Sequence, residues 1–136
     1  MSAVPNLHFD SGIFIYFIDK DPKAIDVLQK NISKLKIDNN DKTYIKIIKE
    51  DALKALQDIK IVFDVVLIDP PYNSNVIERC LVKLKQYNLI DFNSYIFAES
   101  GKKENFNFGG FDLLDTKIYG KSKLTILKLS NSGSIE

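Results

Sequence analysis

Apolar and polar positions along the chain switch between two spacings, and this switching predicts alternating strands and helices. Continuous apolar runs suit strands buried on both faces of a sheet. Such runs occupy residues 12–19, 43–49, 61–68 and 94–100. Apolar residues recur at helical spacing in two stretches, as Ile25, Leu28, Ile32 and Leu35 and then as Ile77, Cys80, Leu81 and Leu84. These stripes are typical of helices that pack one face against a sheet.

Local signals mark where these elements begin and end. Asp21-Pro22 predicts a helix start, with the aspartate as N-cap and the proline at the first helical position. Residues 50–56 predict a short helix, and residues 111–130 predict two strands around a turn at Tyr119, Gly120 and Lys121. The chain is therefore expected to be an α/β protein whose sheet is mainly parallel and ends in an antiparallel C-terminal hairpin.

Composition narrows the class of protein. The chain has 136 residues, which fits one domain, and 45% of them are hydrophobic, which is enough for a packed core. We expect residues 13–129 to form the domain, after an irregular segment 1–12 and before a disordered tail 130–136. The net charge of +1 excludes a strongly basic binder, so any basic surface must be local. A single cysteine, the lack of a signal-peptide pattern and the lack of a long apolar stretch favour a cytoplasmic protein without a membrane partner.

Acidic residues stand at the ends of four predicted strands: Asp19, Asp51, Asp69 and Glu99. Ligands of such sheets bind beyond the carboxyl ends of the strands. A carboxylate at the position of Asp19 can accept hydrogen bonds from two ribose hydroxyls. Alternatively, Asp19 competes with Asp21 to cap the following helix, and Asp51 caps the short helix instead of contacting an adenine ring.

The sequence Asp69-Pro70-Pro71-Tyr72 follows a buried strand directly. Two prolines end a strand, but they explain neither the acid before them nor the ring after them. An exocyclic amine of a nucleic-acid base is a poor nucleophile, and a site helps by accepting both of its hydrogens. The Asp69 carboxylate and the Pro70 carbonyl offer two such acceptors, Pro71 restricts Pro70 to an extended conformation, and Tyr72 offers a face for stacking a base.

Together, the segments "FIDKDPKAIDVLQKNISKL", "KEDALKAL", "FDVVLIDPPYN", "YIFAES" and "KIYGKSKLTIL" resemble the RsmD-like methyltransferases in order and spacing. These enzymes have a Rossmann-like class I methyltransferase fold, use S-adenosylmethionine and modify a guanine N2 of small-subunit (16S) ribosomal RNA. The resemblance implies that the cofactor is bound by Asp19, Lys20, Asp51 and Ala52. It implies that the target base is held by Asp69, Pro70, Pro71 and Tyr72, with no metal. It places the RNA near Lys117, Tyr119, Lys121 and Lys123, although an ordinary solvated hairpin explains these four equally well.

One part of the family pattern is missing from this chain. The family has a first strand and a glycine-rich loop ahead of the region that begins here, and that strand lies between those ending in Asp19 and Asp69. The sequence therefore resembles an N-terminally truncated member. Residues 3–9 are a poor candidate for the missing strand because Pro5 interrupts them. We expect a second copy or a separate N-terminal fragment to complete the sheet.

Three functions stay open at this point. The first is methyl transfer to an RNA base amine, with ribosomal RNA or an assembling small ribosomal subunit as partner. The second is a non-catalytic remnant, or one half of a split enzyme. The third is an adenine-N6 DNA methyltransferase, whose chemistry uses a similar arrangement of acceptors but which commonly needs extra target-recognition sequence.

Overall fold

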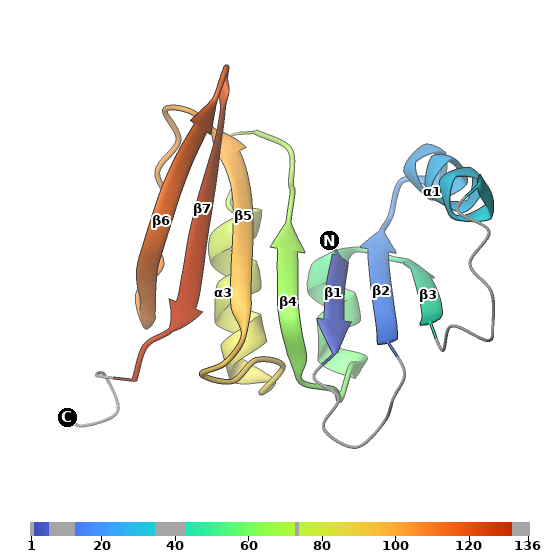
Figure 1. Cartoon of the computed structure of the whole chain (residues 1–136), viewed down its shortest axis with the longest axis horizontal. Coiled ribbons are helices and arrows are strands. Elements are labelled where there is room, and N and C mark those ends of the chain that lie inside the picture. Colours follow the sequence, from blue (N-terminus) through green and yellow to red (C-terminus); the bar gives the residue numbers. More distant parts are fainter. Residues whose placement is uncertain (1, 6–12, 35–42, 73, 132–136) are drawn as a thin grey trace.

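A single seven-stranded sheet organises the chain, with strand order β3-β2-β1-β4-β5-β7-β6 (Figure 1). The computed structural model describes residues 2–5, 13–34, 43–72 and 74–131. The strands are β1 (Ser2–Pro5), β2 (Ile13–Asp19), β3 (Thr43–Lys49), β4 (Phe63–Ile68), β5 (Tyr95–Gly101), β6 (Phe111–Tyr119) and β7 (Ser122–Leu129). The helices are α1 (Pro22–Lys34), α2 (Ala52–Ala55) and α3 (Val76–Gln86), and a 3-10 turn, η2 (Leu56–Asp58), follows α2.

The predicted elements between residues 13 and 129 are confirmed. α1 begins at Pro22, and Asp21 caps it by accepting the Lys23 N–H at 3.0 Å. The predicted antiparallel hairpin is present, and Gly120 adopts the positive φ of +53° that its two-residue turn requires. Of the tail predicted to be disordered, Ser130 donates its N–H to the Gly110 carbonyl at 2.9 Å, and residues 132–136 lie outside the described residues.

The sheet is mixed, which corrects the expectation that it would be mainly parallel. Among the described strands, only the β2–β3 and β4–β5 pairings are parallel, and the other four pairings are antiparallel. β1 causes half of the antiparallel pairings because it runs against both of its neighbours. β2, β3, β4 and β5 nevertheless point in one direction, so their carboxyl ends meet at one edge of the sheet.

β1 fills the position between β2 and β4, where the sequence predicted an irregular segment and no suitable strand. Ser2 pairs with Phe17 on one side and with Leu67 on the other. Pro5 is tolerated because it lies at the end of β1, beyond a shift of register, where its missing N–H interrupts little of the ladder. The sheet is thus continuous within this chain. Residues 6–12, the rest of the predicted irregular segment, lie outside the described residues.

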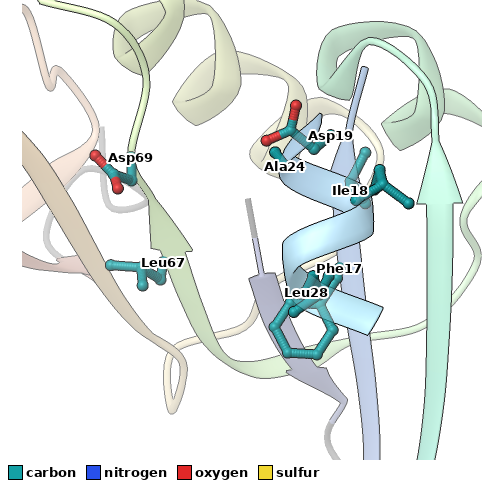
Figure 2. Close-up of a pocket in the computed structure, with 8 residues that line it drawn as sticks. Phe17, Ile18, Asp19, Ala24, Leu28, Leu67 and Asp69 are labelled. Atoms are coloured by element: carbon teal, nitrogen blue, oxygen red, sulfur yellow. The ribbon is translucent and has the colours of Figure 1, made fainter. Parts of the chain in front are cut away.

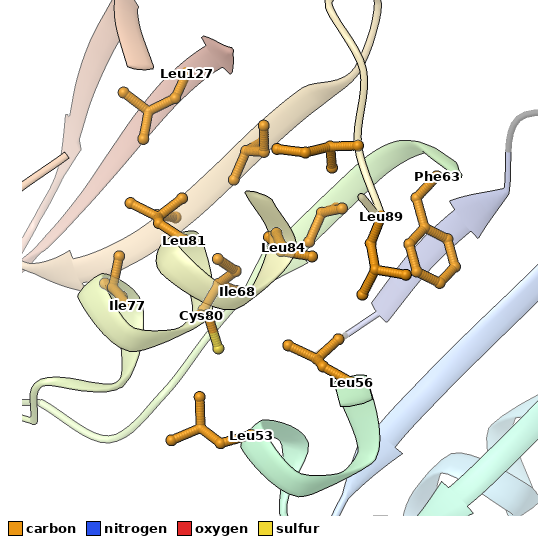
Figure 3. Packing of buried hydrophobic residues seen from close by; sticks show 14 of the residues in the cluster. Leu53, Leu56, Phe63, Ile68, Ile77, Cys80, Leu81, Leu84, Leu89 and Leu127 are labelled. Carbon is orange, nitrogen blue, oxygen red and sulfur yellow. The ribbon is translucent and has the colours of Figure 1, made fainter. Parts of the chain in front are cut away.

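The core lies on one face of the sheet, which α2 and α3 cover (Figure 1). Its fully buried side chains interlock between sheet and helices, as Figure 3 shows for Leu53, Leu56, Phe63, Ile68, Cys80, Leu81, Leu84 and Leu127. The other face is more open, since Val65, Leu67 and Tyr95 are each more than a third exposed. The packed face fixes the ends of β4 and β5, and these ends position the residues described next.

Candidate functional site

A cleft of about 340 Å³ lies at the carboxyl edge of the sheet, between the ends of β2 and β4 and the beginnings of α2 and α3. Its size falls in the range of roughly 300–1,000 Å³ that is common for small-molecule sites. It is lined by Ile18, Asp19, Lys20, Asp51, Ala52, Ile68, Asp69, Pro70, Pro71, Ser74, Val76 and Cys80. The cleft therefore brings together all four residues predicted to bind a cofactor and three of the four predicted to hold a base.

Asp19 stands where β2 meets α1, and its hydrogen bonds separate its role from that of Asp21. The Asp21 carboxylate accepts the Lys23 N–H and caps the helix, whereas an Asp19 carboxylate oxygen accepts the Asp21 N–H at 2.8 Å. The Asp19 carbonyl accepts the Glu50 N–H at 3.0 Å, which ties this turn to the end of β3. Asp19 therefore is not the helix cap. It is held half-buried by two neighbouring loops at the wall of the cleft.

A second cavity of about 240 Å³ adjoins the same wall beside α1. Figure 2 shows the carboxylates of Asp19 and Asp69 on facing sides of this space, with the apolar side chains of Phe17, Leu28 and Leu67 below them. Two acidic walls above an apolar floor suit a ligand that carries hydroxyl or amine donors on a partly apolar body.

Asp51 occupies the N-cap position of α2, but its side chain makes no capping hydrogen bond. Its carbonyl accepts the N–H groups of Lys54 and Ala55 at 3.1 and 2.9 Å, so the backbone alone starts the helix. The geometry thus does not support the view of Asp51 as a side-chain cap. Asp51 and Ala52 both face the cleft.

The turn after β4 is braced at two points. The Ser74 hydroxyl donates to the Pro71 carbonyl at 2.8 Å, which leaves this bond outside the Asp69-Pro70 acceptor pair. The Tyr72 hydroxyl lies 2.7 Å from the Ser122 hydroxyl, while the residue remains 54% exposed. Tyr72 does not line the cleft itself. Its ring is fixed at the phenol end and open to solvent elsewhere, as a stacking surface needs to be.

Glu99 lies beside Asp69 and was not among the predicted site residues, although it ends a predicted strand. The two side chains share a hydrogen bond, and the pKa of Glu99 is raised, mainly by the charge of Asp69 and further by burial and by that bond. A hydrogen bond to Ser122 acts in the opposite direction and lowers the pKa of Glu99. Asp69, Glu99, Ser122 and Tyr72 are consequently linked from end to end.

Cys80 lies at the inner wall of the cleft, where α3 packs on the sheet. Burial raises the pKa of its thiol to about 11. A neutral, fully buried thiol is a poor nucleophile. The cysteine therefore shapes the cleft as an apolar side chain.

The hairpin residues predicted to contact RNA divide between two faces. Tyr119 pairs with Ser122 and Lys117 with Leu124, so both lie on the side of the sheet that carries the Ser122 hydroxyl. Lys123 lies on the opposite side, where its ammonium group donates to the Glu104 carbonyl. Lys121 is an exposed turn residue. Apart from these placements, no helix in the described part of the chain has the length and apolar character to cross a membrane.

Comparison with known proteins gives a consistent relationship. A family model described as Conserved hypothetical protein 95 matches residues 13–128. The chain is 32% identical over 71 residues to the Uncharacterized methylase RP545 of Rickettsia prowazekii, covering 52% of this chain and 30% of that protein. It is 29% identical over 93 residues to the Ribosomal RNA small subunit methyltransferase D of Buchnera aphidicola, covering 68% and 46% respectively. The chain spans between 30% and 61% of the length of the curated relatives it matches.

Solved structures support the fold class. A conserved hypothetical protein from Streptococcus pyogenes superposes with a TM-score of 0.73 at 25% identity, covering 85% of this chain and 71% of that one. An SAH-bound methyltransferase from Podospora anserina superposes with a TM-score of 0.59 over 85% of this chain and 60% of that one. The latter is 11% identical, so this likeness concerns the fold alone. The structural neighbours are class I methyltransferases, as expected from the sequence.

Proposed function

The chain belongs to the Conserved hypothetical protein 95 family of RsmD-like methyltransferases, and from this premise we propose that it methylates an exocyclic amine of an RNA base. The proposed methyl donor is S-adenosylmethionine, and the proposed target is a guanine N2 of small-subunit ribosomal RNA. The observation that carries the proposal is the cleft itself, in which Asp19 and Asp51 meet Asp69 and Pro70 although they follow three different strands.

Asp69 and Pro70 give the cleft its proposed chemistry. The Asp69 carboxylate and the Pro70 carbonyl accept the two hydrogens of the target amine and stabilise positive charge as it develops on the nitrogen. The Asp69 carboxylate then takes the proton that the amine releases. Tyr72, held at its hydroxyl by Ser122, stacks on the base. Little reorganisation is needed because the backbone of the turn is braced by Ser74.

The donor set on the opposite wall fits the nucleoside part of the cofactor. Asp19 accepts hydrogen bonds from the ribose hydroxyls, with Lys20 beside it, and Asp51 and Ala52 contact the adenine. When bound, S-adenosylmethionine supplies an electrophilic methyl group on a sulfonium. β1 offers no glycine-rich loop at this edge, since it is antiparallel to β2 and its carboxyl end points to the opposite edge. The fit is therefore argued for the nucleoside part alone.

The RNA is proposed to approach along the hairpin, where Lys117, Tyr119 and Lys121 are exposed beside the Ser122 hydroxyl. Lysines attract the phosphate backbone, and a tyrosine ring can stack on an unpaired base. Lys123 is the weakest of the four predicted contacts because its ammonium group is already engaged by Glu104. The partner in this proposal is ribosomal RNA, either free or in an assembling small subunit.

Calorimetric titration of the purified chain with S-adenosylmethionine tests the cofactor site. We expect micromolar binding, about −8 kcal/mol, and at least a tenfold loss in Asp19→Ala. Asp21→Ala is the matched control, since it removes the same charge two residues away from a side chain that caps α1 and does not line the cleft. No binding by the folded wild-type chain would favour a non-catalytic remnant or one half of a split enzyme.

Methyl transfer to guanine-containing ribosomal RNA and to adenine-containing DNA then tests the target. We expect transfer to the RNA and a loss of at least about 100-fold in Asp69→Asn, because the amide no longer offers two equivalent acceptor oxygens. Transfer to the DNA instead would identify the chain as an adenine-N6 methyltransferase.

A further inference from the structure

Four side chains from separate parts of the chain form one series of hydrogen bonds beside the cleft. Asp69 follows β4, Tyr72 lies in the next turn, Glu99 is on β5 and Ser122 begins β7. Tyr72 bonds Ser122 at 2.7 Å, and Glu99 bonds both Ser122 and Asp69. The series thus connects the proposed stacking ring to the proposed amine acceptor through two residues that have had no role so far.

The direction of these bonds follows from the number of protons available. Two carboxyl groups in contact favour a state with one proton between them, because ionising both places like charges side by side. The raised pKa of Glu99 assigns this proton to Glu99, which then donates to Asp69. A serine hydroxyl has one hydrogen, so Ser122 accepts from Tyr72 if it donates to Glu99. All three hydrogens then point toward Asp69, which stays an acceptor.

Other charged groups near Glu99 do not interrupt this series. Lys117 is on the same face but one strand beyond Leu124, which is the residue paired with Glu99. Lys123 is on the opposite face, where it bonds the Glu104 carbonyl. Tyr72 reaches Glu99 only through Ser122. Asp69 is thus the charged group in direct contact with Glu99 on this face of the described chain.

We propose that Glu99 is a positioning residue that holds the Asp69 carboxylate toward the target amine, and that Ser122 couples this pair to the Tyr72 ring. This inference rests on the proposed function for the identity of the amine. The arrangement of the four side chains does not rest on it. A bonded carboxylate loses rotamer freedom and keeps its remaining lone pairs free for the substrate. The stacking surface and the acceptor would then move as one unit.

Carbon-13 NMR of the side-chain carboxyls tests the arrangement without any methyl transfer. We expect Glu99 to titrate above its ordinary pKa of 4.5 in the wild-type chain and to move toward it in Asp69→Asn. Tyr72 ring signals should shift in Glu99→Ala and in Ser122→Ala, and stay unchanged in Glu78→Ala. Glu78 is the matched control because its carboxylate also accepts one hydrogen bond, from the Asn107 N–H at 2.7 Å, but lies outside the cleft. An ordinary titration of Glu99, or one unaffected by Asp69→Asn, would overturn the proposal.

Kinetics on the RNA substrate test the positioning role. We expect Glu99→Ala to lower kcat by about 10- to 100-fold, as misplacing a catalytic group does, with the KM for S-adenosylmethionine unchanged. Glu99→Gln should recover most of the rate, because its amide can still donate to Asp69 and accept from Ser122. It should also remove the fall in kcat that the wild type shows when rising pH removes the shared proton. A merely structural Glu99 would leave the shape of the pH profile unchanged, and that result would overturn the role.

The two arms separate the two hypotheses. A wild-type chain that transfers no methyl group but shows the coupled titration contradicts the proposed function of this chain and leaves the carboxyl pair established. An active wild type whose Glu99 titrates normally contradicts only the positioning role.

Discussion

The phenol of Tyr72 and the hydroxyl of Ser122 lie 2.7 Å apart although fifty positions separate them in the chain. The bond joins the turn after β4 to the start of β7 across the intervening β5. It therefore fixes the ring relative to the sheet and not merely relative to its own loop.

This bond predicts a measurable coupling between the two hydroxyls. Because Tyr72 is half exposed, we expect a double-mutant cycle of Tyr72→Phe and Ser122→Ala to give a coupling near the low end for hydrogen bonds, about 0.5 kcal/mol. Urea unfolding of the four proteins measures it. Strictly additive effects of the two substitutions would show that the hydroxyls do not interact in solution.

Glu99 predicts a pH dependence of stability. Its pKa is raised above the ordinary 4.5, so the folded chain binds this proton more tightly than the unfolded chain does. This contribution is fully present below pH 4.5 and is lost as pH rises through the raised pKa. Glu99→Gln cannot ionise, so its free energy of unfolding should increase relative to wild type between about pH 4 and about pH 8. The gain should shrink in an Asp69→Asn background, and a gain on acidification would have the wrong sign.

Asp21 predicts a purely local effect on α1. Its carboxylate accepts the Lys23 N–H at 3.0 Å, and loss of an N-cap costs about 1 kcal/mol. We expect Asp21→Ala to lower the free energy of unfolding by this amount, and Asp21→Asn or Asp21→Ser to restore most of it. Equal stability of the alanine variant and the wild type in urea unfolding would mean that the cap is unimportant.

Cys80 predicts slow thiol chemistry in the native state. The thiol is fully buried and its pKa is raised to about 11, so both access and ionisation oppose reaction. At about pH 8 a disulfide reagent should modify the folded chain far more slowly than the urea-unfolded chain. Rapid modification of the folded chain, at the rate of a free thiol, would show that α3 does not seal this position.

β1 predicts protection of backbone amides on both of its neighbours. Ser2 and Ala3 pair with Phe17 and Tyr16 of β2 and with Leu67 and Val66 of β4. Removing residues 1–5 should therefore accelerate hydrogen exchange on facing edges of β2 and β4 together, since both lose their ladder partner. The distant β5–β7 pairing is the internal control. Unchanged exchange on either strand would remove β1 from the sheet.

Most of the fold could be predicted because it is written in local patterns. Each strand from β2 to β5 is a run of apolar residues, and α1 and α3 are apolar stripes with recognisable starts at Asp21-Pro22 and after the Pro-Pro turn. β1 could not be predicted in this way. It has four residues, one of them proline, and its partner β4 begins only at Phe63, so no local pattern indicates the pairing.

The same distinction applies to the site. Convergence of Asp19, Asp51 and Asp69 follows from the rule that parallel strands bring their carboxyl ends to one edge. That rule also indicates Glu99 as an acid near the edge, although not as a partner of Asp69. Ser122 has no such signal, because its place depends on the register in which Gly101 pairs with it across β5 and β7. A single-residue shift of that register would turn the hydroxyl to the other face.

The direction of β1 has a practical consequence for anyone who produces this protein. Because Ser2 pairs with Phe17 and Leu67, the chain enters the sheet at the edge where Asp19 and Asp69 stand, and Figure 1 shows the N-terminus there, level with the ends of β2 and β4. An affinity tag or fusion partner placed ahead of Ser2 would emerge beside the candidate cleft and compete with whatever binds there. A tag at the C-terminus leaves from beyond β7, at the other end of the strands, and is the better choice for every binding experiment described above.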